Sequence, residues 1–153
     1  MFSKATEYAL RATIFIAQSG SAENKVRLED ISKAIGSPVS FTAKILQALR
    51  KDNRIIQSVS GPNGGFYITD QGLKLPVKAV LEAMGEYDVL ERCVLGLNEC
   101  SEEQPCPMHS RYKVIKKQLI KLFETESIGA LAEGMKKGDV FIRNWVEKKH
   151  VRK

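Results

Sequence analysis

The segment Gly61-Pro62-Asn63-Gly64-Gly65 constrains the fold more than any other part of this sequence. Three glycines in five positions weaken both helix and strand, while the Asn-Gly step favours a tight turn with positive φ. Residues 55–60 and 66–69, on either side of the turn, are short runs typical of strands. The pattern therefore predicts a β-hairpin with a glycine-rich tip.

Three helices are expected before this hairpin. Apolar residues recur at three- and four-residue intervals over 4–19, and Gly20-Ser21 ends that first helix. A second helix fits 28–35, whose apolar residues share one face, and Gly36 is its expected C-terminal stop. Both segments are long enough to contribute to a helical core.

The third helix follows the turn at 36–38 and runs to about Asp52. Either Ser37 or Ser40 is expected to cap its N-terminus. The residues it is expected to bury are Phe41, Ile45, Ala48 and Leu49. Two helices joined by such a tight turn indicate a helix-turn-helix, and the hairpin that follows extends it to a winged helix. The alternative is a plain helical hairpin with a solvated polar side, on which the β-hairpin only packs.

The polar side of the third helix suits nucleic acid. Its hydroxyl, amide and cationic groups match phosphate oxygens and base edges in the major groove. Residues 25–54 carry seven basic against three acidic residues, which favours a polyanionic partner. The hairpin tip has few side chains and could approach the DNA backbone closely. The residues predicted to contact double-stranded DNA are Ser3, Lys4, Ser40, Phe41, Thr42, Lys44, Gln47, Arg50, Ser60, Gly61, Pro62, Asn63, Gly64 and Gly65.

The second half of the chain is also expected to be helical, with helices over 75–84, 110–124 and 128–135, the last capped by Ser127. The longest has a narrow apolar stripe typical of a dimer seam, although it could instead pack on its own domain. The stripe consists of Tyr112, Ile115, Leu119 and Leu122. Its other faces carry Lys113, Lys116, Lys117 and Lys121.

These elements predict a mostly α fold with a small β-hairpin wing. The expected parts are a winged helix-turn-helix domain (1–75), a connecting helix with a cysteine-rich loop (76–109), a dimerisation helix with a closing short helix (110–135), and a basic tail (136–153). No apolar run approaches the roughly 20 residues that cross a bilayer, and the N-terminus lacks a signal core. A cytoplasmic protein without a membrane partner is therefore expected.

All three cysteines lie in an acidic segment. Residues 82–103 carry seven acidic residues against one basic residue, and Cys93, Cys100, Cys106 and His109 form the pattern Cys-x6-Cys-x5-Cys-x2-His. Three thiolates and an imidazole complete a soft four-ligand set for tetrahedral zinc or an iron–sulfur cluster. Their concentration among polar residues disfavours a role as small core hydrophobes. Because an acidic loop repels nucleic acid, a metal here is expected to sense rather than to bind it.

The cysteines also allow two interpretations without a structural metal. Cys106 and His109 lie close enough to suggest nucleophilic catalysis, but no third orienting group or oxyanion turn accompanies them, so the chain is not expected to be an enzyme. A regulator that senses by thiol oxidation, without a metal, is the better alternative.

Over roughly residues 2–135 the chain resembles the IscR/NsrR family of winged-helix transcription regulators, many of which hold iron–sulfur clusters. The resemblance is carried by the cysteines, the 61–66 wing and four further motifs. These motifs are Glu7-Tyr8-Ala9-Leu10-Arg11, Leu28-Glu29-Asp30-Ile31-Ser32, Phe41-Thr42-Ala43-Lys44-Ile45-Leu46-Gln47-Ala48-Leu49 and Ser127-Ile128-Gly129-Ala130-Leu131. It implies a homodimer with crossing long helices, a palindromic operator, and a repressor whose cluster senses redox state, nitric oxide or iron–sulfur status.

The resemblance also implies a ligand set. Cys93, Cys100 and Cys106 match the family's three cluster thiolates. His109 matches the histidine that completes a 2Fe–2S site in one branch, and Glu7 matches a carboxylate donated across the dimer to a 4Fe–4S cluster in the nitric-oxide-sensing branch. Both fourth ligands are present, so the cluster type stays open, as does zinc.

The operator sequence does not carry over from the family. Ser60 replaces an arginine that one branch inserts into the minor groove, and Ala43 stands at that branch's recognition-helix glutamate position. The expected mechanism is that gain, loss or nitrosylation of the cluster reorders the 93–109 loop. The geometry of the two winged helices, and their match to the two half-sites, would change with it.

Overall fold

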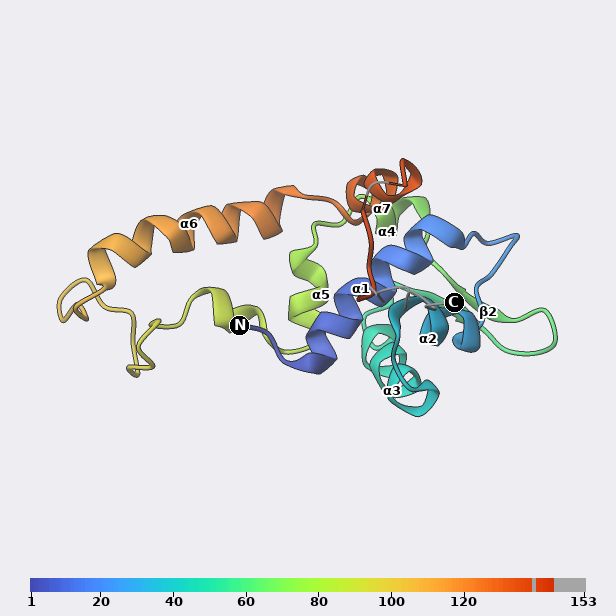
Figure 1. Cartoon of the computed structure of the whole chain (residues 1–153), viewed down its shortest axis with the longest axis horizontal. Coiled ribbons are helices and arrows are strands. Elements are labelled where there is room, and N and C mark those ends of the chain that lie inside the picture. The colour runs from blue at the N-terminus through green and yellow to red at the C-terminus, as the bar shows by residue number, and fades with distance from the viewer. Residues whose placement is uncertain (139, 145–153) are drawn as a thin grey trace, which may run out of the picture.

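The computed structural model describes residues 1–138 and 140–144. A winged helix occupies one end of the molecule, and a long helix extends away from it (Figure 1). The elements are α1 (Lys4–Ser19), α2 (Leu28–Ile35), α3 (Val39–Arg50), β1 (Gln57–Val59), β2 (Gly65–Tyr67), α4 (Asp70–Leu73), α5 (Lys78–Ala83), the 3-10 helix η1 (Tyr87–Leu90), α6 (His109–Thr125) and α7 (Ile128–Lys136). The prediction of a mostly helical fold with one small hairpin is confirmed.

Helix α1 is the centre of the winged helix, because α2, α3, α5 and α7 all pack against it. Ala9 and Ala12 are fully buried, and their small side chains let the neighbouring helices approach closely. The core around them is aliphatic. It includes Ile16, Ile31, Ile35, Ile45, Leu46, Leu49, Ile55, Ile56, Val80 and Ile128.

The helix-turn-helix forms as expected, except for its cap. Gly36 ends α2 in the left-handed region at φ 69°, as a C-terminal glycine should. The prediction that Ser37 or Ser40 caps α3 is wrong, because Pro38 occupies the cap position without a side-chain hydrogen bond. Ser37 is buried, and its carbonyl accepts a hydrogen bond from the Ser32 hydroxyl. Ser40 lies inside the first helical turn.

The wing is an antiparallel hairpin in which Ser58 pairs with Phe66. Its strands are shorter than the predicted 55–60 and 66–69, because Ile55 and Ile56 are buried in the core before β1 begins. An unexpected contact joins Val26, from the loop before α2, to Phe66 through two backbone hydrogen bonds of 2.9 and 2.8 Å. The base of the wing is thereby attached to the helix-turn-helix.

The connection after the wing differs from prediction in detail. Helix α5 is shorter than the expected 75–84, and α4 and η1 were not expected. Helix α5 begins later than expected because the Leu75 carbonyl accepts a hydrogen bond from the Ile128 N–H (3.0 Å) instead of continuing a helix. Ser127 caps α7 as predicted, with its hydroxyl oxygen accepting from the Ala130 N–H at 3.1 Å.

Part of the predicted basic tail returns to the winged helix. Ile142 packs against the core, and Arg11 Nη1 donates to the Ile142 carbonyl (3.3 Å) and to the Ile35 carbonyl (3.2 Å). Residues 139 and 145–153 of that prediction lie outside the described residues. Within the described part of the chain, no helix is both long and apolar enough to cross a membrane.

Candidate DNA-binding surface and cysteine loop

Helix α3 turns a polar face outward. The exposed side chains on this face are Ser40, Lys44, Gln47 and Arg50. The prediction that Thr42 shares this face is wrong, since Thr42 is fully buried and its hydroxyl donates to the Pro38 carbonyl at 2.9 Å. At about 100° per residue, Thr42 lies on the opposite side of the helix from Ser40. It is therefore excluded as a direct DNA contact.

Other predicted contact residues lie at the edges of this face. Phe41 is half-buried and packs edge-on against Tyr8, with ring centroids 5.7 Å apart. Ser3 caps α1 by accepting the Thr6 N–H at 3.2 Å, and its own N–H donates to Glu86. Lys4 is exposed. Contact of these residues with DNA stays a prediction.

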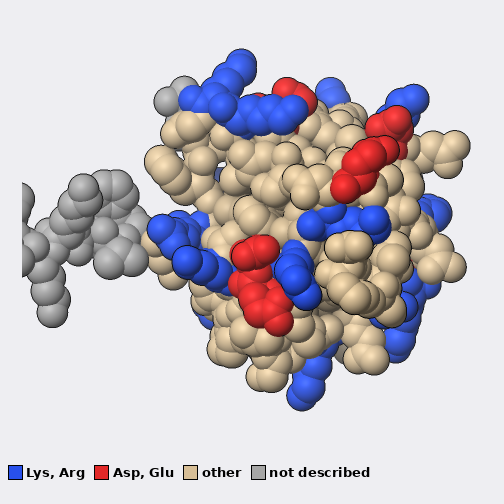
Figure 2. Space-filling model, turned by 90° about the vertical axis from the view of Figure 1, so that its right-hand side faces the viewer, with Lys and Arg blue, Asp and Glu red and all other residues tan. Residues whose placement is uncertain are grey.

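Gln47 and Arg50 stand between two surface hollows. One hollow lies toward the start of the hairpin, at Gln57 and Ser58, and the other lies toward Phe66. Figure 2 views the end of the molecule where the hairpin projects, and Lys and Arg side chains cover more of this face than Asp and Glu. Helix, hollows and hairpin thus bring cationic and hydrogen-bonding groups to the same end of the molecule, as contact with a duplex requires.

Sequence analysis missed Lys51, an exposed residue directly after α3 that lines the first hollow together with Arg50. Its place on this surface could have been predicted from its spacing to Gln47. Lys51 follows Gln47 by four positions, which places both on one side of a helix or of its last turn.

The wing tip depends on its glycines. Gly64 donates to the Gly61 carbonyl at 2.9 Å, and Gly61 has φ +103°. The predicted tip residues Ser60, Gly61, Pro62 and Asn63 are exposed, whereas Gly64 and Gly65 are half-buried. A Cβ on Gly65 would lie 2.7 Å from the Val26 carbonyl oxygen, so glycine is needed where the wing meets the loop before α2.

Substituting Gly64 with alanine should open the wing tip. The added Cβ would lie 2.2 Å from the Val59 carbonyl oxygen and 2.9 Å from the Gly61 carbonyl oxygen, so backbone must move. We expect duplex DNA affinity to fall by about tenfold, equivalent to about 1.4 kcal/mol, because a displaced tip loses its backbone contact. Fluorescence anisotropy measures this change. Gly134→Ala, whose Cβ would meet open space, is the control and should leave affinity unchanged; equal affinities for both variants would contradict a wing contact.

Cys93 lies in a loop whose backbone favours the ionised thiol. The backbone amides of Leu97 and then Leu95 hold the pKa of this thiol below its ordinary value. The Cys106 side chain also approaches the Cys93 sulfur and lowers the same pKa. Gly96, at φ +78°, lets the chain fold back around the thiol. Cys93 and Cys106 are thus one pair of donors.

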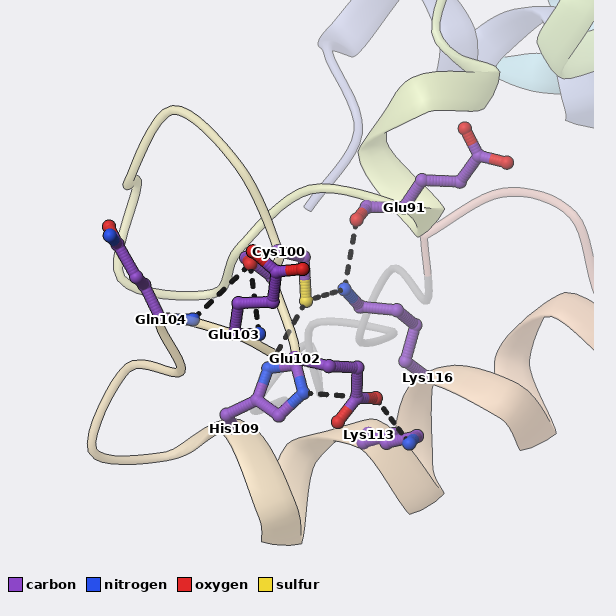
Figure 3. Close-up of polar contacts among 9 residues, drawn as sticks. Glu91, Cys100, Glu102, Glu103, Gln104, His109, Lys113 and Lys116 are labelled. Atoms are coloured by element: carbon purple, nitrogen blue, oxygen red, sulfur yellow. Dashed lines mark hydrogen bonds and ion pairs between the residues drawn. The ribbon is translucent and has the colours of Figure 1, made fainter.

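Cys100 and His109 are a second pair (Figure 3). His109 is the first residue of α6, and its Nδ1 lies 3.5 Å from Cys100 Sγ. The ring is 8% exposed, and its Nε2 is buried without a hydrogen-bond partner. Glu102 lies 3.3 Å from Nε2 but outside hydrogen-bonding alignment. An ion pair with Lys113, and then the proximity of His109, lower the pKa of Glu102.

Lys116 is a component of this site that sequence analysis placed wrongly. It was expected on an outer face of α6, but it is 9% exposed, and its Nζ lies 2.8 Å from both Cys100 Sγ and the Glu91 carbonyl oxygen. The spacing of Lys116 from His109 already indicates that the two side chains lie on the same face of the helix. Lys116 follows His109 by seven positions, and two helical turns return a side chain to the same face.

Across the described residues, no three His, Cys, Asp or Glu side chains converge closely enough to hold a metal ion. The three cysteines are free, and the donors form two pairs rather than one set. Their chemistry nevertheless fits an iron–sulfur cluster, because three thiols and an imidazole are suitable ligands and the imidazole Nδ1 lies 3.5 Å from the Cys100 sulfur. Glu7 is exposed on α1, 4.0 Å from Lys4. Its role as a cross-subunit ligand stays a prediction.

The chain is similar in sequence and in structure to known regulators. Residues 2–134 match the profile of a family described as "Rrf2: Iron-dependent Transcriptional regulator". A putative HTH-type transcriptional regulator of Aquifex aeolicus is 31% identical over 130 residues, covering 84% of this chain and 88% of the relative. The HTH-type transcriptional regulator IscR of Escherichia coli is 28% identical over 133 residues, covering 87% and 80%. The structure of CymR, the global cysteine regulator of B. subtilis, superposes with a TM-score of 0.71 at 14% identity, covering 88% of this chain and 97% of CymR.

Proposed function

The chain belongs to the Rrf2 family of transcriptional regulators, and on that premise we propose that it is a homodimeric repressor whose operator affinity is controlled by an iron–sulfur cluster in the 93–109 loop. As a winged-helix member of a regulator family it is not an enzyme. The finer parts of the proposal are the cluster, the dimer and the palindromic operator. Each is supported by a separate feature of the molecule.

The approach of His109 Nδ1 to Cys100 Sγ, 3.5 Å apart in a loop that holds two further cysteines, is the observation that carries the cluster proposal. The buried Nε2 of the same ring lies 3.3 Å from a Glu102 carboxylate oxygen, and such a contact to the second ring nitrogen orients a ligating histidine. When bound, an iron–sulfur cluster supplies electron-transfer chemistry and reactivity toward oxygen and nitric oxide. Cys93, Cys100, Cys106 and His109 would hold it. The N–H groups of Leu95 and Leu97 would stabilise the Cys93 sulfur.

The loop has a structural route to the DNA-binding domain. His109 begins α6, and near the other end of that helix Phe123 stacks edge-on against Phe2, with centroids 5.6 Å apart. Ser3, the next residue, donates its N–H to Glu86, just before η1. A change in the loop that shifts α6 or η1 therefore acts at the start of α1, the central helix of the winged helix. Operator affinity changes only if the cluster-bound and cluster-free forms favour different arrangements of the winged helices.

The dimer proposal rests on the exposed apolar side chains of α6. Val114, Ile115 and Leu122 are 58%, 51% and 51% exposed, although α6 is 17 residues long and extends away from the winged helix (Figure 1). Apolar side chains repeated along one helix favour pairing with a second copy. Two winged helices related by a two-fold axis would match the half-sites of a palindromic operator.

Anaerobic purification tests the cluster directly. The expected protein is brown, absorbs in the visible range, and contains iron and acid-labile sulfide in proportion to the chain. A colourless protein with stoichiometric zinc would overturn the cluster in favour of zinc at the same ligands. The absorbance spectrum also distinguishes 2Fe–2S from 4Fe–4S.

Thiol oxidation is the second candidate, because the Cys106 side chain lies near enough to the Cys93 thiol to lower its pKa. The fold also resembles that of CymR. On this alternative the anaerobic protein is colourless and free of metal, and peroxide changes its DNA affinity. Loss of that response in Cys93→Ala would support it.

Replacing Lys44 or Arg50 with alanine should weaken duplex binding. Both are exposed on the outer face of α3, and each would lose one phosphate or base contact. We expect a loss of about 1–3 kcal/mol for a base contact, or a salt-dependence slope reduced by about 1 for a phosphate contact. Anisotropy titrations at several salt concentrations separate the two. Lys137→Ala, an exposed lysine just beyond α7, is the control; the same loss in the control would mean that the recognition surface is misplaced.

A further inference from the structure

We propose that Lys116 is the counter-cation of the cluster centre, donating a hydrogen bond to the Cys100 thiolate and stabilising the reduced, more negative state. This inference rests on the proposed function and adds to it a positioning residue that sets the reduction potential.

Lys116 is buried without a full negative charge beside it. Its Nζ lies 2.8 Å from Cys100 Sγ and 2.8 Å from the Glu91 carbonyl oxygen, and the Tyr112 ring centroid is 5.8 Å away. Within the described part of the chain, no carboxylate lies within 4.0 Å of this nitrogen. Burying an ammonium is costly unless an anion accompanies it. An anionic centre ligated through Cys100 supplies that charge.

The geometry fits a donor that stays in place when the centre is bound. One N–H of Lys116 is held by the Glu91 carbonyl at the end of η1, which fixes the ammonium over the sulfur (Figure 3). His109 and Lys116 share one face of α6, so the ligand nitrogen and the cation come from the same rigid helix. The Lys116 ammonium contacts the Cys100 sulfur directly, so it can keep this contact when Cys100 binds the cluster.

Lys113 offers a matched control on the same face of α6. It is 41% exposed, and its charge is already paired with Glu102, itself 65% exposed. The two lysines therefore differ in burial and in partner but share a helix and a charge. If any positive charge near the loop raised the reduction potential, removing either lysine would lower it. If Lys116 acts directly on Cys100, only its removal would lower the potential.

The expected effect is on the reduction potential. Reduction adds one electron to the centre, and a buried cation that donates a hydrogen bond to a ligand sulfur stabilises the added charge. Lys116→Met keeps the length of the side chain and removes its charge. We expect about a tenfold shift of the one-electron equilibrium toward the oxidised state, about 59 mV lower in potential. Lys116→Arg should stay close to the wild-type value.

The test is a spectrally monitored redox titration with dithionite on anaerobically reconstituted, full-length wild type, Lys116→Met, Lys116→Arg and Lys113→Met. A lowered potential in Lys116→Met alone supports the inference. Equal potentials in wild type and Lys116→Met overturn it, and a colourless wild type overturns the proposed cluster instead. If Lys116→Met fails to retain the cluster, retention by Lys116→Arg supports the cation. Loss in both variants with a lowered melting temperature indicates a purely structural lysine and overturns it.

Discussion

Replacing Ile115 with aspartate is expected to convert the proposed homodimer into a monomer and to lower affinity for a palindromic operator by about a hundredfold or more. The drop follows because the second half-site is bound intramolecularly only when two winged helices are joined, and such linkage contributes about 10²–10⁴ in affinity. Ile115 is 51% exposed on α6, in the predicted apolar stripe that also contains Leu122. A carboxylate buried in a helix seam without a partner is strongly destabilising.

Two measurements check this result. Sedimentation velocity reports the mass, and anisotropy compares a full operator with a single half-site, for which the variant and the wild type should bind alike. Lys117→Gln is the control, because Lys117 is exposed on another face of α6 and both substitutions lower the net charge by one. An Ile115→Asp protein that remains dimeric would place the dimer interface elsewhere.

The second large effect is expected from Cys100→Ala, which should abolish the iron, the sulfide and the visible absorbance of the anaerobic protein. Cys100 is exposed, so removing its sulfur leaves no cavity in the core and the cluster-free fold should remain. The variant should then bind the operator with the affinity of cluster-free wild type. Cys100 is better suited to this test than Cys93, which is buried and whose replacement would also disturb packing.

Glu103→Gln is the matched control, since Glu103 is exposed in the same loop and is not a predicted ligand. Metal and sulfide analysis, absorbance and the melting temperature are measured on all three proteins. Full cluster content in Cys100→Ala would remove Cys100 from the ligand set. Equal operator affinity for cluster-bound and cluster-free wild type would mean that the cluster does not control DNA binding.

Helix positions were predictable because they depend on local features. The bounds of α1 and α2 agree with prediction to the residue, and the ends of α6 and α7 agree within one residue. Apolar spacing, Gly36 and the Ser127 cap encode these positions over a few residues. The cap of α3 failed because two serines and a proline compete within four positions, and packing of Ser37 decided between them.

The candidate site was predictable in composition but less so in arrangement. The exposed face of α3 follows from helical geometry, and strict use of the same geometry would have excluded Thr42. The cysteine and histidine residues proposed as ligands are evident from their spacing. Their division into two pairs, and the position of Lys116 between Cys100 and Glu91, depend on how a long loop folds against α6.

Local sequence patterns were enough to predict the order and extent of the main helices, the hairpin with its glycine tip, and the cysteines and histidine of the acidic loop. Each of these is a property of residues close together in the chain. Three further contacts depend on the packed chain: Val26 pairs with the wing, Ile142 returns to the core, and Lys116 is buried against a sulfur. These contacts join residues from separate segments, because burying apolar surface and pairing buried polar groups are settled only when the whole chain packs.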